Sequence, residues 1–232
     1  MKQILWFGVA ALLSACGGGG SAPAGLRTYS TAFPATENPV DQHGVWINGH
    51  REGLDWCDVA TTHGLARGTE SGNVQYDDST ALLAGVWKPD QGAEATVHSV
   101  NQTSTAYEEV ELRLRSAISA HEATGYEINF RCLKTGDAYC QIVRWNGPLG
   151  KFTYLNAAGG ASFGVSNGDV VKATVVGHVI TAFINGKQVL QATDPTYATG
   201  NPGIGLYLAG PSGLNRDYGF TRFSAWEMKA GS

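Results

Sequence analysis

The feature that most constrains this chain is the recurrence of short apolar runs with period-two alternation, separated by turn residues, from about residue 44 to residue 228. Alternation with a period of two is the pattern of a half-buried β-strand, and no stretch shows the period of an amphipathic helix. About a dozen short strands with regular turns over roughly 200 residues are typical of an antiparallel sandwich or jelly roll. The sequence therefore predicts an all-β fold in one domain.

The turn signals between these runs divide the chain into individual strands. Gly177-His178 and Asn185-Gly186 are two-residue turn signals between apolar runs, so we expect residues 170–192 to form an antiparallel meander. The predicted strands cover residues 44–47, 80–86, 93–100, 105–116, 126–132, 139–145, 152–155, 170–176, 179–184, 188–192, 204–209 and 218–228.

The charge balance excludes one class of partner. The chain has 16 Lys and Arg against 20 Asp and Glu, a formal net charge of -4, and it contains no run of basic residues. A nucleic-acid-binding surface is therefore not predicted. Beyond the first sixteen residues, no apolar stretch approaches the roughly 20 residues that span a bilayer. We expect contact with a membrane only through the N-terminus.

The N-terminus has the pattern of an export signal. Lys2 is followed by an apolar run over residues 4–13, and then by Leu13-Ser14-Ala15-Cys16. This tetrapeptide resembles the lipobox of bacterial lipoproteins, which implies cleavage before Cys16 and lipidation of that residue. An ordinary secretory peptide is the alternative. The predicted organisation is a signal peptide over residues 1–15, a lipidated cysteine with a Gly/Ser/Ala/Pro tether over 16–26, and a domain over 27–232.

The tether favours a surface location. A run of Gly, Ser, Ala and Pro residues follows Cys16 and forms a flexible spacer that can hold a domain off a membrane. Residue 17 is glycine and not the aspartate that resembles an inner-membrane retention signal. We therefore expect an exported protein that is lipid-anchored to the bacterial cell envelope, at the outer membrane or cell surface.

Three cysteines remain within the domain, so at most one internal disulfide can form. Cys132 and Cys140 flank the turn residues 135–137, and a three-residue hairpin loop there would place the two cysteines opposite each other. This spacing predicts a Cys132–Cys140 disulfide with Cys57 free, and two buried free thiols are the alternative. No Cys-x-x-Cys or paired-histidine pattern indicates a zinc site.

Two central runs have one apolar and one polar face. In residues 105–116, Val110, Leu112 and Leu114 occupy even positions, while the odd positions are polar or charged. The next run, 126–132, alternates in the same way. Across the predicted hairpin we expect residue 131 opposite 141 and residue 127 opposite 145. The predicted ligand-binding set on the polar face is Tyr107, Glu109, Glu111, Arg113, Arg115, Glu127, Asn129, Arg131, Tyr139, Gln141 and Trp145.

This mixture of side chains suits a sugar ligand. Carboxylates, guanidinium groups and amides bind hydroxyl groups, and aromatic faces stack against C–H patches. The alternative is a solvated outer face with cross-strand salt bridges, which any antiparallel sheet can have. The presence of Tyr and Trp among the charges favours a binding face.

Three segments of the C-terminal half carry a family resemblance. Gly168-Asp169-Val170, then Ile180-Thr181-Ala182-Phe183-Ile184-Asn185-Gly186-Lys187, then Gly203-Ile204-Gly205-Leu206-Tyr207 resemble the hairpin and glycine-rich strand of concanavalin A-like lectin/glucanase domains. That superfamily includes laminin G-like and 3-keto-disaccharide hydrolase-like domains, and the resemblance covers roughly residues 46–226. It implies a jelly roll of two curved sheets, with a polysaccharide or oligosaccharide bound on the concave sheet or at its rim.

The resemblance also raises the question of calcium, since many such domains hold one ion on the convex side. Asp77, Asp78 and Asp217 are acidic candidates, but none has a specific pattern. Arg222 stands where related domains often have an acidic residue. A bound calcium ion therefore stays open, and no other cofactor is predicted.

Catalysis is a second hypothesis for the same face. Glu109 and Glu111 have the i, i+2 spacing that brings two carboxylates together on a strand, as retaining glycosidases require. The stretch resembles the E-x-D-x-E signature of family 16 glucanases, but Glu111 replaces the aspartate and Arg113 replaces the second glutamate. We expect Arg113 to hold neighbouring carboxylates ionised, which is unfavourable for a general acid.

A polysaccharide lyase is a less favoured enzymatic alternative. Glu111-Leu112-Arg113, Glu127-Ile128-Asn129 and Tyr139-Cys140-Gln141 are similar to fragments of alginate lyase strands, but Asn129 replaces the histidine. No complete catalytic set is present. The sequence thus predicts a surface-tethered glycan-binding domain, with a glycoside hydrolase or lyase as the alternative and a protein-binding adhesion module as the third hypothesis.

Overall fold

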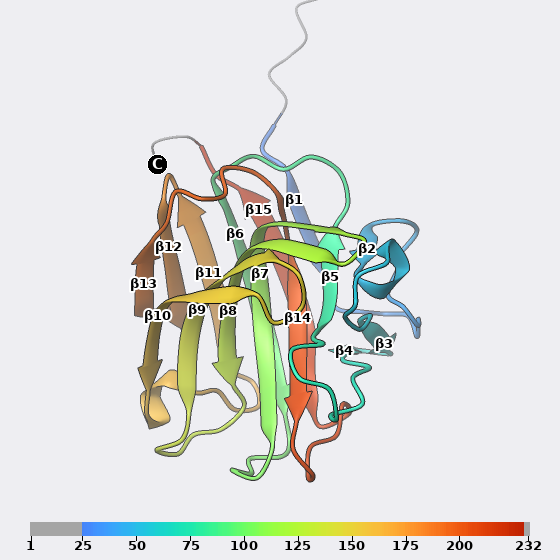
Figure 1. Ribbon diagram of the computed structural model, residues 1–232, viewed down its shortest axis with the longest axis vertical. Helices are drawn as coiled ribbons and strands as arrows, with labels where there is room; N and C mark the ends of the chain where they lie inside the picture. Colours follow the sequence, from blue (N-terminus) through green and yellow to red (C-terminus); the bar gives the residue numbers. More distant parts are fainter. Residues whose placement is uncertain (1–24, 230–232) are drawn as a thin grey trace, which may run out of the picture.

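The alternating runs form fifteen strands in two antiparallel sheets in the computed structural model, which describes residues 25–229. Sheet A has the order β13-β12-β11-β6-β15-β4-β3, with β1 also paired to β15. Sheet B has the order β10-β9-β8-β7-β14-β5-β2 and faces the viewer in Figure 1. The structure confirms the predicted all-β sandwich.

The strands of sheet A are β1 (Thr28–Thr31), β3 (Ala60–Thr62), β4 (Leu65–Arg67), β6 (Gln91–Ser99), β11 (Val170–Val176), β12 (Val179–Ile184), β13 (Lys187–Thr193) and β15 (Tyr218–Glu227). Those of sheet B are β2 (Trp46–Asn48), β5 (Ser79–Leu83), β7 (Tyr107–Ser119), β8 (Glu122–Arg131), β9 (Tyr139–Gly147), β10 (Phe152–Gly159) and β14 (Asn201–Ala209). Neither of the two 3-10 helices among residues 25–229, His50–Glu52 and Ala161–Phe163, is long and apolar enough to cross a membrane.

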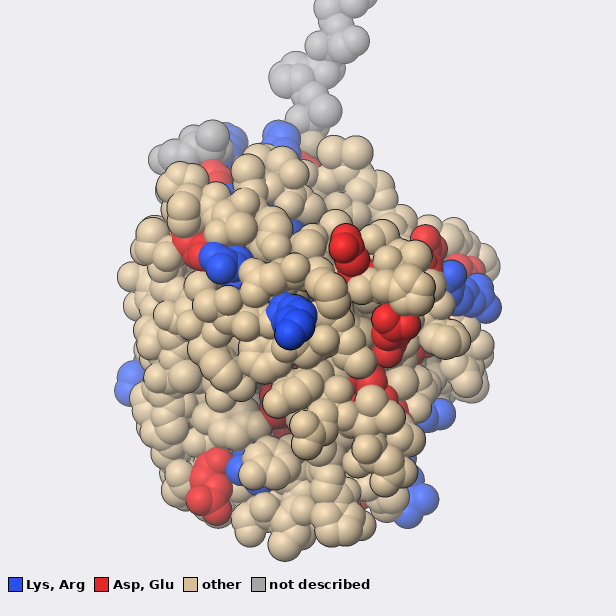
Figure 2. Space-filling model, viewed as in Figure 1, with Lys and Arg blue, Asp and Glu red and all other residues tan. Residues whose placement is uncertain are grey.

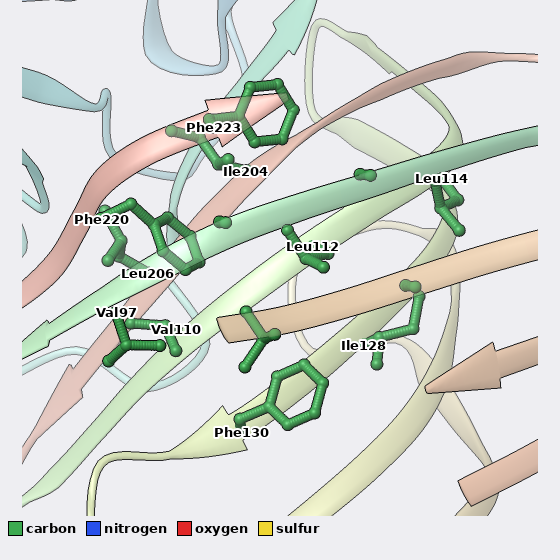
Figure 3. Packing of buried hydrophobic residues seen from close by; sticks show 14 of the residues in the cluster. Val97, Val110, Leu112, Leu114, Ile128, Phe130, Ile204, Leu206, Phe220 and Phe223 are labelled. Carbon is green, nitrogen blue, oxygen red and sulfur yellow. The ribbon is translucent and has the colours of Figure 1, made fainter. Parts of the chain in front are cut away.

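The main core lies between the two sheets. Figure 3 shows side chains of β7, β8 and β14 from sheet B packed against those of β6 and β15 from sheet A. Leu112 and Ile128 are fully buried there, as are Ile204 and Phe220. Because alternate residues of each strand point into this core, the remaining residues of sheet B are available on its other face.

The predicted meander is confirmed. β11, β12 and β13 are antiparallel neighbours, and β11 and β12 have the predicted limits. Three strands were not predicted. β1 has the polar sequence Thr-Tyr-Ser-Thr, and β3 and β4 have three residues each, too few to show alternation.

A second, smaller cluster covers part of the other face of sheet B. Leu54 and Trp56, from the segment after β2, pack with Ala123 of β8 and Trp145 of β9. The Trp56 and Trp145 ring centroids are 4.2 Å apart. The polar face of sheet B is therefore covered by apolar side chains at one end.

The predicted disulfide is wrong. The β8–β9 register pairs Phe130 with Cys140 and Asn129 with Gln141, which is displaced by two residues from the prediction. Cys132 lies beyond the end of β8, in a loop longer than the predicted hairpin turn. Cys132 and Cys140 are both free, buried thiols, and Cys57 is also free.

The two ends of the described chain meet at one end of the sandwich. Thr28 at the start of β1 pairs with Trp226 near the end of β15, and the Glu227 amide donates to the Arg27 carbonyl at 2.9 Å. Figure 1 shows both strands reaching the upper end of the molecule. The predicted signal peptide, Cys16 and most of the tether lie outside the described residues.

Candidate functional site

The polar face of sheet B results from the alternation of apolar and polar residues along β7 and β8. Glu109, Glu111 and Arg113 point away from the core, because Val110 and Leu112 between them point into it. In the β7–β8 pair, Glu111 lies opposite Asn129 and Arg113 lies opposite Glu127. The alternation thus brings the predicted polar residues of both strands onto one face.

This face is hollowed into a cleft of about 240 Å³. Figure 2, viewed onto sheet B, shows acidic atoms recessed among uncharged side chains near the middle of the face. The cleft is lined by Tyr76, Asp78, Tyr107, Glu109, Glu111, Glu127, Asn129, Tyr139, Gln141, Val143, Trp145, Phe152, Tyr154 and Tyr207.

Four buried carboxylates form the floor of the cleft, and we call Asp78, Glu109, Glu111 and Glu127 the acidic cluster. Arg113 forms ion pairs with three of them: Nη2 lies 2.8 Å from Asp78 Oδ2 and 2.5 Å from Glu111 Oε2, and Nη1 lies 2.8 Å from Glu127 Oε2. The Arg113 guanidinium also lies 5.2 Å from the Trp56 ring centroid. The arginine is therefore an internal counterion, held beneath the cleft.

The other side chains of the floor are held by hydrogen bonds. Trp145 Nε1 donates to Glu127, and the Tyr139 hydroxyl donates to Glu109. Asn129 Nδ2 donates to Glu127 Oε1 at 2.8 Å and to Gln141 Oε1 at 3.3 Å. The Asn129 Oδ1 atom is buried and has no protein partner. The floor is thus ordered, and one of its acceptors is unused.

Gly205 provides the space for this arrangement. It lies in β14 opposite Glu111 of β7. A Cβ atom at Gly205 would lie 2.1 Å from Glu111 Oε2 and 2.8 Å from Arg113 Nε. Only glycine leaves room for the ion pair to lie over this strand.

Burial raises the pKa values of three members of the acidic cluster, Asp78, Glu109 and Glu111. The pKa of Glu109 rises to about 8, mainly through desolvation, with the Tyr139 hydrogen bond opposing the rise. The pKa of Asp78 rises to about 7, through desolvation and the charge of Glu127, against the opposing effect of Arg113. Desolvation also raises the pKa of Glu111 well above its usual value.

The expectation that Arg113 holds its neighbours ionised is therefore wrong for Asp78 and Glu111. Desolvation alone would lower the pKa of Arg113, but Glu111, Glu127 and Asp78 together raise it, so the guanidinium stays charged. One guanidinium cannot neutralise three buried carboxylates. Asp78, Glu109 and Glu111 therefore bind protons more readily than exposed carboxylates do.

The cluster does not fit a resident metal ion. Oxygen atoms of Asp78, Glu111 and Glu127 lie within 4.8 Å of one another, the one such group among residues 25–229. The Arg113 guanidinium is bound to all three carboxylates, so a cation would have to displace it. The other predicted calcium candidates lie elsewhere: Asp77 accepts a contact from Cys57 Sγ, and Asp217 is paired with Arg216.

Most of the predicted ligand-binding residues are brought together. Eight of the eleven line the cleft, and Arg113 lies directly beneath it. Arg131 is at its edge, where its guanidinium lies 4.3 Å from the Tyr107 ring centroid and 5.7 Å from that of Tyr139. Glu127 lies opposite Val143 and not opposite Trp145 as predicted, a shift of two residues that preserves the face of each side chain.

Arg115 is not part of the cleft, contrary to the prediction. A bulge interrupts β7 between Leu114 and Ala117, and Arg115 has a φ of 46°. Its guanidinium donates to the Pro89 carbonyl at 2.7 Å and to the Tyr197 carbonyl at 3.0 Å. A Cβ at Gly200 would lie 2.3 Å from the Arg115 carbonyl carbon, so this glycine makes room for the bulge.

Five cleft residues were not predicted as ligand contacts, and Asp78 was considered only for calcium. Tyr207 lies opposite Glu109, and alternation along β14 would have placed it on the same face. Tyr154 lies opposite Val143 on the neighbouring strand pair. Tyr76 and Asp78 come from the loop before β5, where no periodicity indicates direction. The unpredicted lining residues are Tyr76, Val143, Phe152, Tyr154 and Tyr207.

The fold is similar to that of several solved structures. The carbohydrate-binding module CBM66 from Bacillus subtilis aligns with a TM-score of 0.52 and 14% identity, over 82% of this chain and 96% of that one. The exoplasmic/lumenal domain of VIP36, in a Ca²⁺/Man3GlcNAc-bound form, aligns with a TM-score of 0.56 and 12% identity, over 85% and 92% of the two chains.

A β-agarase A structure in complex with oligoagarose aligns with a TM-score of 0.54 and 9% identity, over 88% of this chain and 94% of that one. No protein-family model matches the sequence, and no curated protein matches it. At these identities the likenesses concern the fold alone. Together with the two antiparallel sheets, they show that the chain has the concanavalin A-like lectin and glucanase fold.

Proposed function

We propose that the cleft on sheet B binds a glycan. The observation that carries this proposal is the combination of seven aromatic side chains around the cleft with a buried, hydrogen-bonded polar floor. The similar structures include a carbohydrate-binding module, an oligoagarose complex and a Man3GlcNAc-bound domain, which supports the same class of ligand.

Three of the seven aromatic side chains are exposed, although an exposed surface ordinarily favours polar groups. Tyr154 is 56% exposed, Tyr107 47% and Tyr76 39%, and all three line the cleft. Aromatic rings of this kind stack against the C–H faces of sugars, while the polar groups beneath them bind hydroxyl groups. The aromatic rim therefore stacks against the sugar rings, and the polar floor fixes their orientation through hydrogen bonds.

The floor also requires little ordering on binding. Trp145, Tyr139 and Asn129 are already held by the acidic cluster through hydrogen bonds. Immobilising a rotamer-rich side chain costs about 0.5–1.5 kcal/mol, so a prearranged floor retains more of the interaction energy as affinity.

A glycan array followed by calorimetry tests this proposal. Tyr154→Ala and Tyr107→Ala should weaken glycan binding by roughly tenfold each, as expected when an anchoring aromatic contact worth more than about 1 kcal/mol is lost. Phe183→Ala is the matched control, because Phe183 is a partly exposed aromatic on β12 of sheet A. Binding that survives both tyrosine substitutions, or that Phe183→Ala abolishes, would place the site elsewhere.

Glycoside hydrolysis is the second candidate function, and Glu109 favours it. Glu109 lines the cleft with a pKa of about 8. A carboxyl group with this pKa holds its proton at neutral pH, as a general acid must. New reducing ends, lost in Glu109→Gln, would establish a hydrolase. Absorbance from an unsaturated uronate would instead establish a lyase, and binding without turnover leaves a lectin-like domain.

If no glycan binds, the protein-binding alternative replaces the proposal. In that case Tyr139→Ala and Trp145→Ala should abolish capture of a protein partner, because both side chains form part of the cleft. Capture of a protein that is competed by free glycan would return the assignment to carbohydrate.

We also propose that the domain is tethered at the cell surface by a lipid on Cys16. This proposal rests on the lipobox-like residues 13–16 and the spacer that follows them. Cys16→Ser should move the protein from the detergent phase to the aqueous phase in a detergent partition. Unchanged partitioning of that variant would refute the lipid anchor without affecting the glycan proposal.

A further inference from the structure

The floor of the cleft is rich in hydrogen-bond acceptors. Carboxylate oxygens of the acidic cluster line it, and the Gln141 Oε1 atom accepts a hydrogen bond from Asn129. A buried carboxyl group that releases its proton when a ligand ammonium takes the same place is an acceptor only. Two of the donors beside the acidic cluster are already used, because Trp145 Nε1 and the Tyr139 hydroxyl both donate to carboxylates.

One acceptor is unsatisfied in a way that points to a ligand. Asn129 is 3% exposed and lines the cleft, and its Oδ1 atom has no protein partner. A buried acceptor without a partner costs about 1–3 kcal/mol. A ligand that brings a donor to this position recovers that cost.

The cleft also lacks positive charge. No lysine or arginine is among its lining residues. Arg113 is bound by three carboxylates beneath the floor, and Arg131 at the edge donates to the carbonyls of Asp137 at 2.9 Å and Ala106 at 2.9 Å. An anionic sugar would therefore add negative charge to a desolvated site in which one guanidinium already pairs with three of four buried carboxyl groups, which is unfavourable.

We infer that the cleft selects glycans whose sugars carry a free, protonated amine over glycans that carry uronate or sulfate groups. This inference rests on the proposed glycan-binding function and names the class of its ligand. An ammonium group has three donors and no acceptor, which complements a floor rich in acceptors. Its hydrogen bonds to carboxylates are charge-assisted, and the surrounding aromatic rings attract cations.

Glu109 is the member of the acidic cluster that is best placed to receive the amine. The ion pairs of Arg113 are with Asp78, Glu111 and Glu127, whereas Glu109 receives the Tyr139 hydroxyl. The raised pKa of Glu109 has a related cause, since a buried carboxylate beside other carboxylates favours binding a proton. An ammonium supplies positive charge at the same place.

The experiment compares four soluble oligosaccharides of equal length by calorimetry at neutral pH with the intact domain. These are a β-1,4-glucosamine oligomer, its fully N-acetylated form, a neutral β-1,4-glucose oligomer and a uronate oligomer. We expect the glucosamine oligomer to bind roughly tenfold or more tightly than its N-acetylated form, the ratio that one charge-assisted hydrogen bond provides. This preference should weaken with added salt.

Two glutamine substitutions locate the effect. Glu109→Gln keeps an acceptor for the Tyr139 hydroxyl and should reduce the ratio of glucosamine to N-acetylated binding towards one. Glu94→Gln is the charge-matched control, because Glu94 lies on β6 of sheet A, where it lines a separate surface groove. If both variants show the same preference for the glucosamine oligomer, Glu109 does not bind the amine, and its assignment as the amine site is overturned.

The outcomes separate this inference from the proposed function. Equal binding of the amine and N-acetylated forms, or tighter binding of the uronate oligomer, overturns the amine selectivity but leaves a glycan-binding cleft. Binding of none of these oligomers, together with an empty glycan array, overturns the proposed function and the inference with it.

Discussion

Glu70→Gln is expected to remove a large pH-dependent loss of stability from this domain. Glu70 is 3% exposed in the segment between β4 and β5, where its Oε1 accepts the Ser79 amide at 2.7 Å. Its Oε2 is buried without a partner, and so is Asn215 Oδ1. Both atoms lie close to Gly68: a Cβ atom added to this glycine would be 2.0 Å from Glu70 Oε2 and 2.8 Å from Asn215 Oδ1. A proton on Glu70 supplies the donor that these two acceptors lack.

The size and the sign follow from the pKa. Desolvation raises the pKa of Glu70 to about 8 in the folded protein, from an ordinary value of 4.5. Below pH 4.5 both the folded and the unfolded chain hold this proton, so Glu70 does not lower the unfolding free energy there. Between pH 4.5 and 8 the unfolded chain releases the proton while the folded chain retains it, so stability falls as pH rises. At about 1.4 kcal/mol per pKa unit, the loss above pH 8 is on the order of 4–5 kcal/mol.

Urea denaturation at pH 5, 7 and 9 measures this effect. Gln is isosteric with the protonated acid: its oxygen can accept the Ser79 amide and its amide nitrogen can donate to Asn215. Glu70→Gln and the wild type should therefore have similar unfolding free energies at pH 5, and the variant should be more stable by several kcal/mol at pH 9. Glu52→Gln, at an exposed glutamate, is the control and should follow the wild type. Parallel pH profiles for Glu70→Gln and the wild type would refute the reasoning.

Three further outcomes are expected. Gly205→Ala should lower the unfolding free energy by about 1–3 kcal/mol, because the added methyl group overpacks the acidic cluster, and it should weaken glycan binding. The control, Gly136→Ala at an open position, should change the unfolding free energy by no more than about 0.5 kcal/mol in the same urea titration. Arg113→Met should lower the unfolding free energy by about 3–5 kcal/mol at pH 7, because it leaves buried carboxylates without their counterion. The decrease should be smaller at pH 5, where more of these carboxylates are protonated, and an equal decrease at both pH values would contradict this account. Cys132 and Cys140 should both be alkylated after unfolding without reductant, and a mass spectrum that shows them linked would contradict the structure.

The face assignments in the site could be predicted because they depend on local geometry. Successive side chains of a strand point to opposite faces, so Glu109 and Glu111 share a face once Leu112 is assigned to the core. The same argument applies to Glu127 and Asn129 on β8. It extends to Tyr207, because alternation along β14 places this residue on the same face as its partner Glu109.

The register between strands could not be predicted by the same means. A shift of two residues in the β8–β9 pair leaves every side chain on its original face, so the hydrophobic pattern does not distinguish the two registers. The loop at residues 132–138 decides between them, and it is held by contacts outside the hairpin, such as the hydrogen bond from the Cys132 amide to the Glu108 carbonyl at 2.8 Å. The predicted Cys132–Cys140 disulfide failed for this reason, since it depended on the register and not on the faces.

The sequence by itself thus determined the sheet class, the meander from β11 to β13 and the polar face of β7 and β8, because backbone geometry and local turn chemistry specify all three. Only the tertiary structure decided that this face is a cleft. A bulge removes Arg115 from it, a loop brings Asp78 into it, and Trp56 covers one end. The protonation of the acidic cluster was also decided there, because desolvation depends on every segment that excludes water, and these segments lie far apart in the chain.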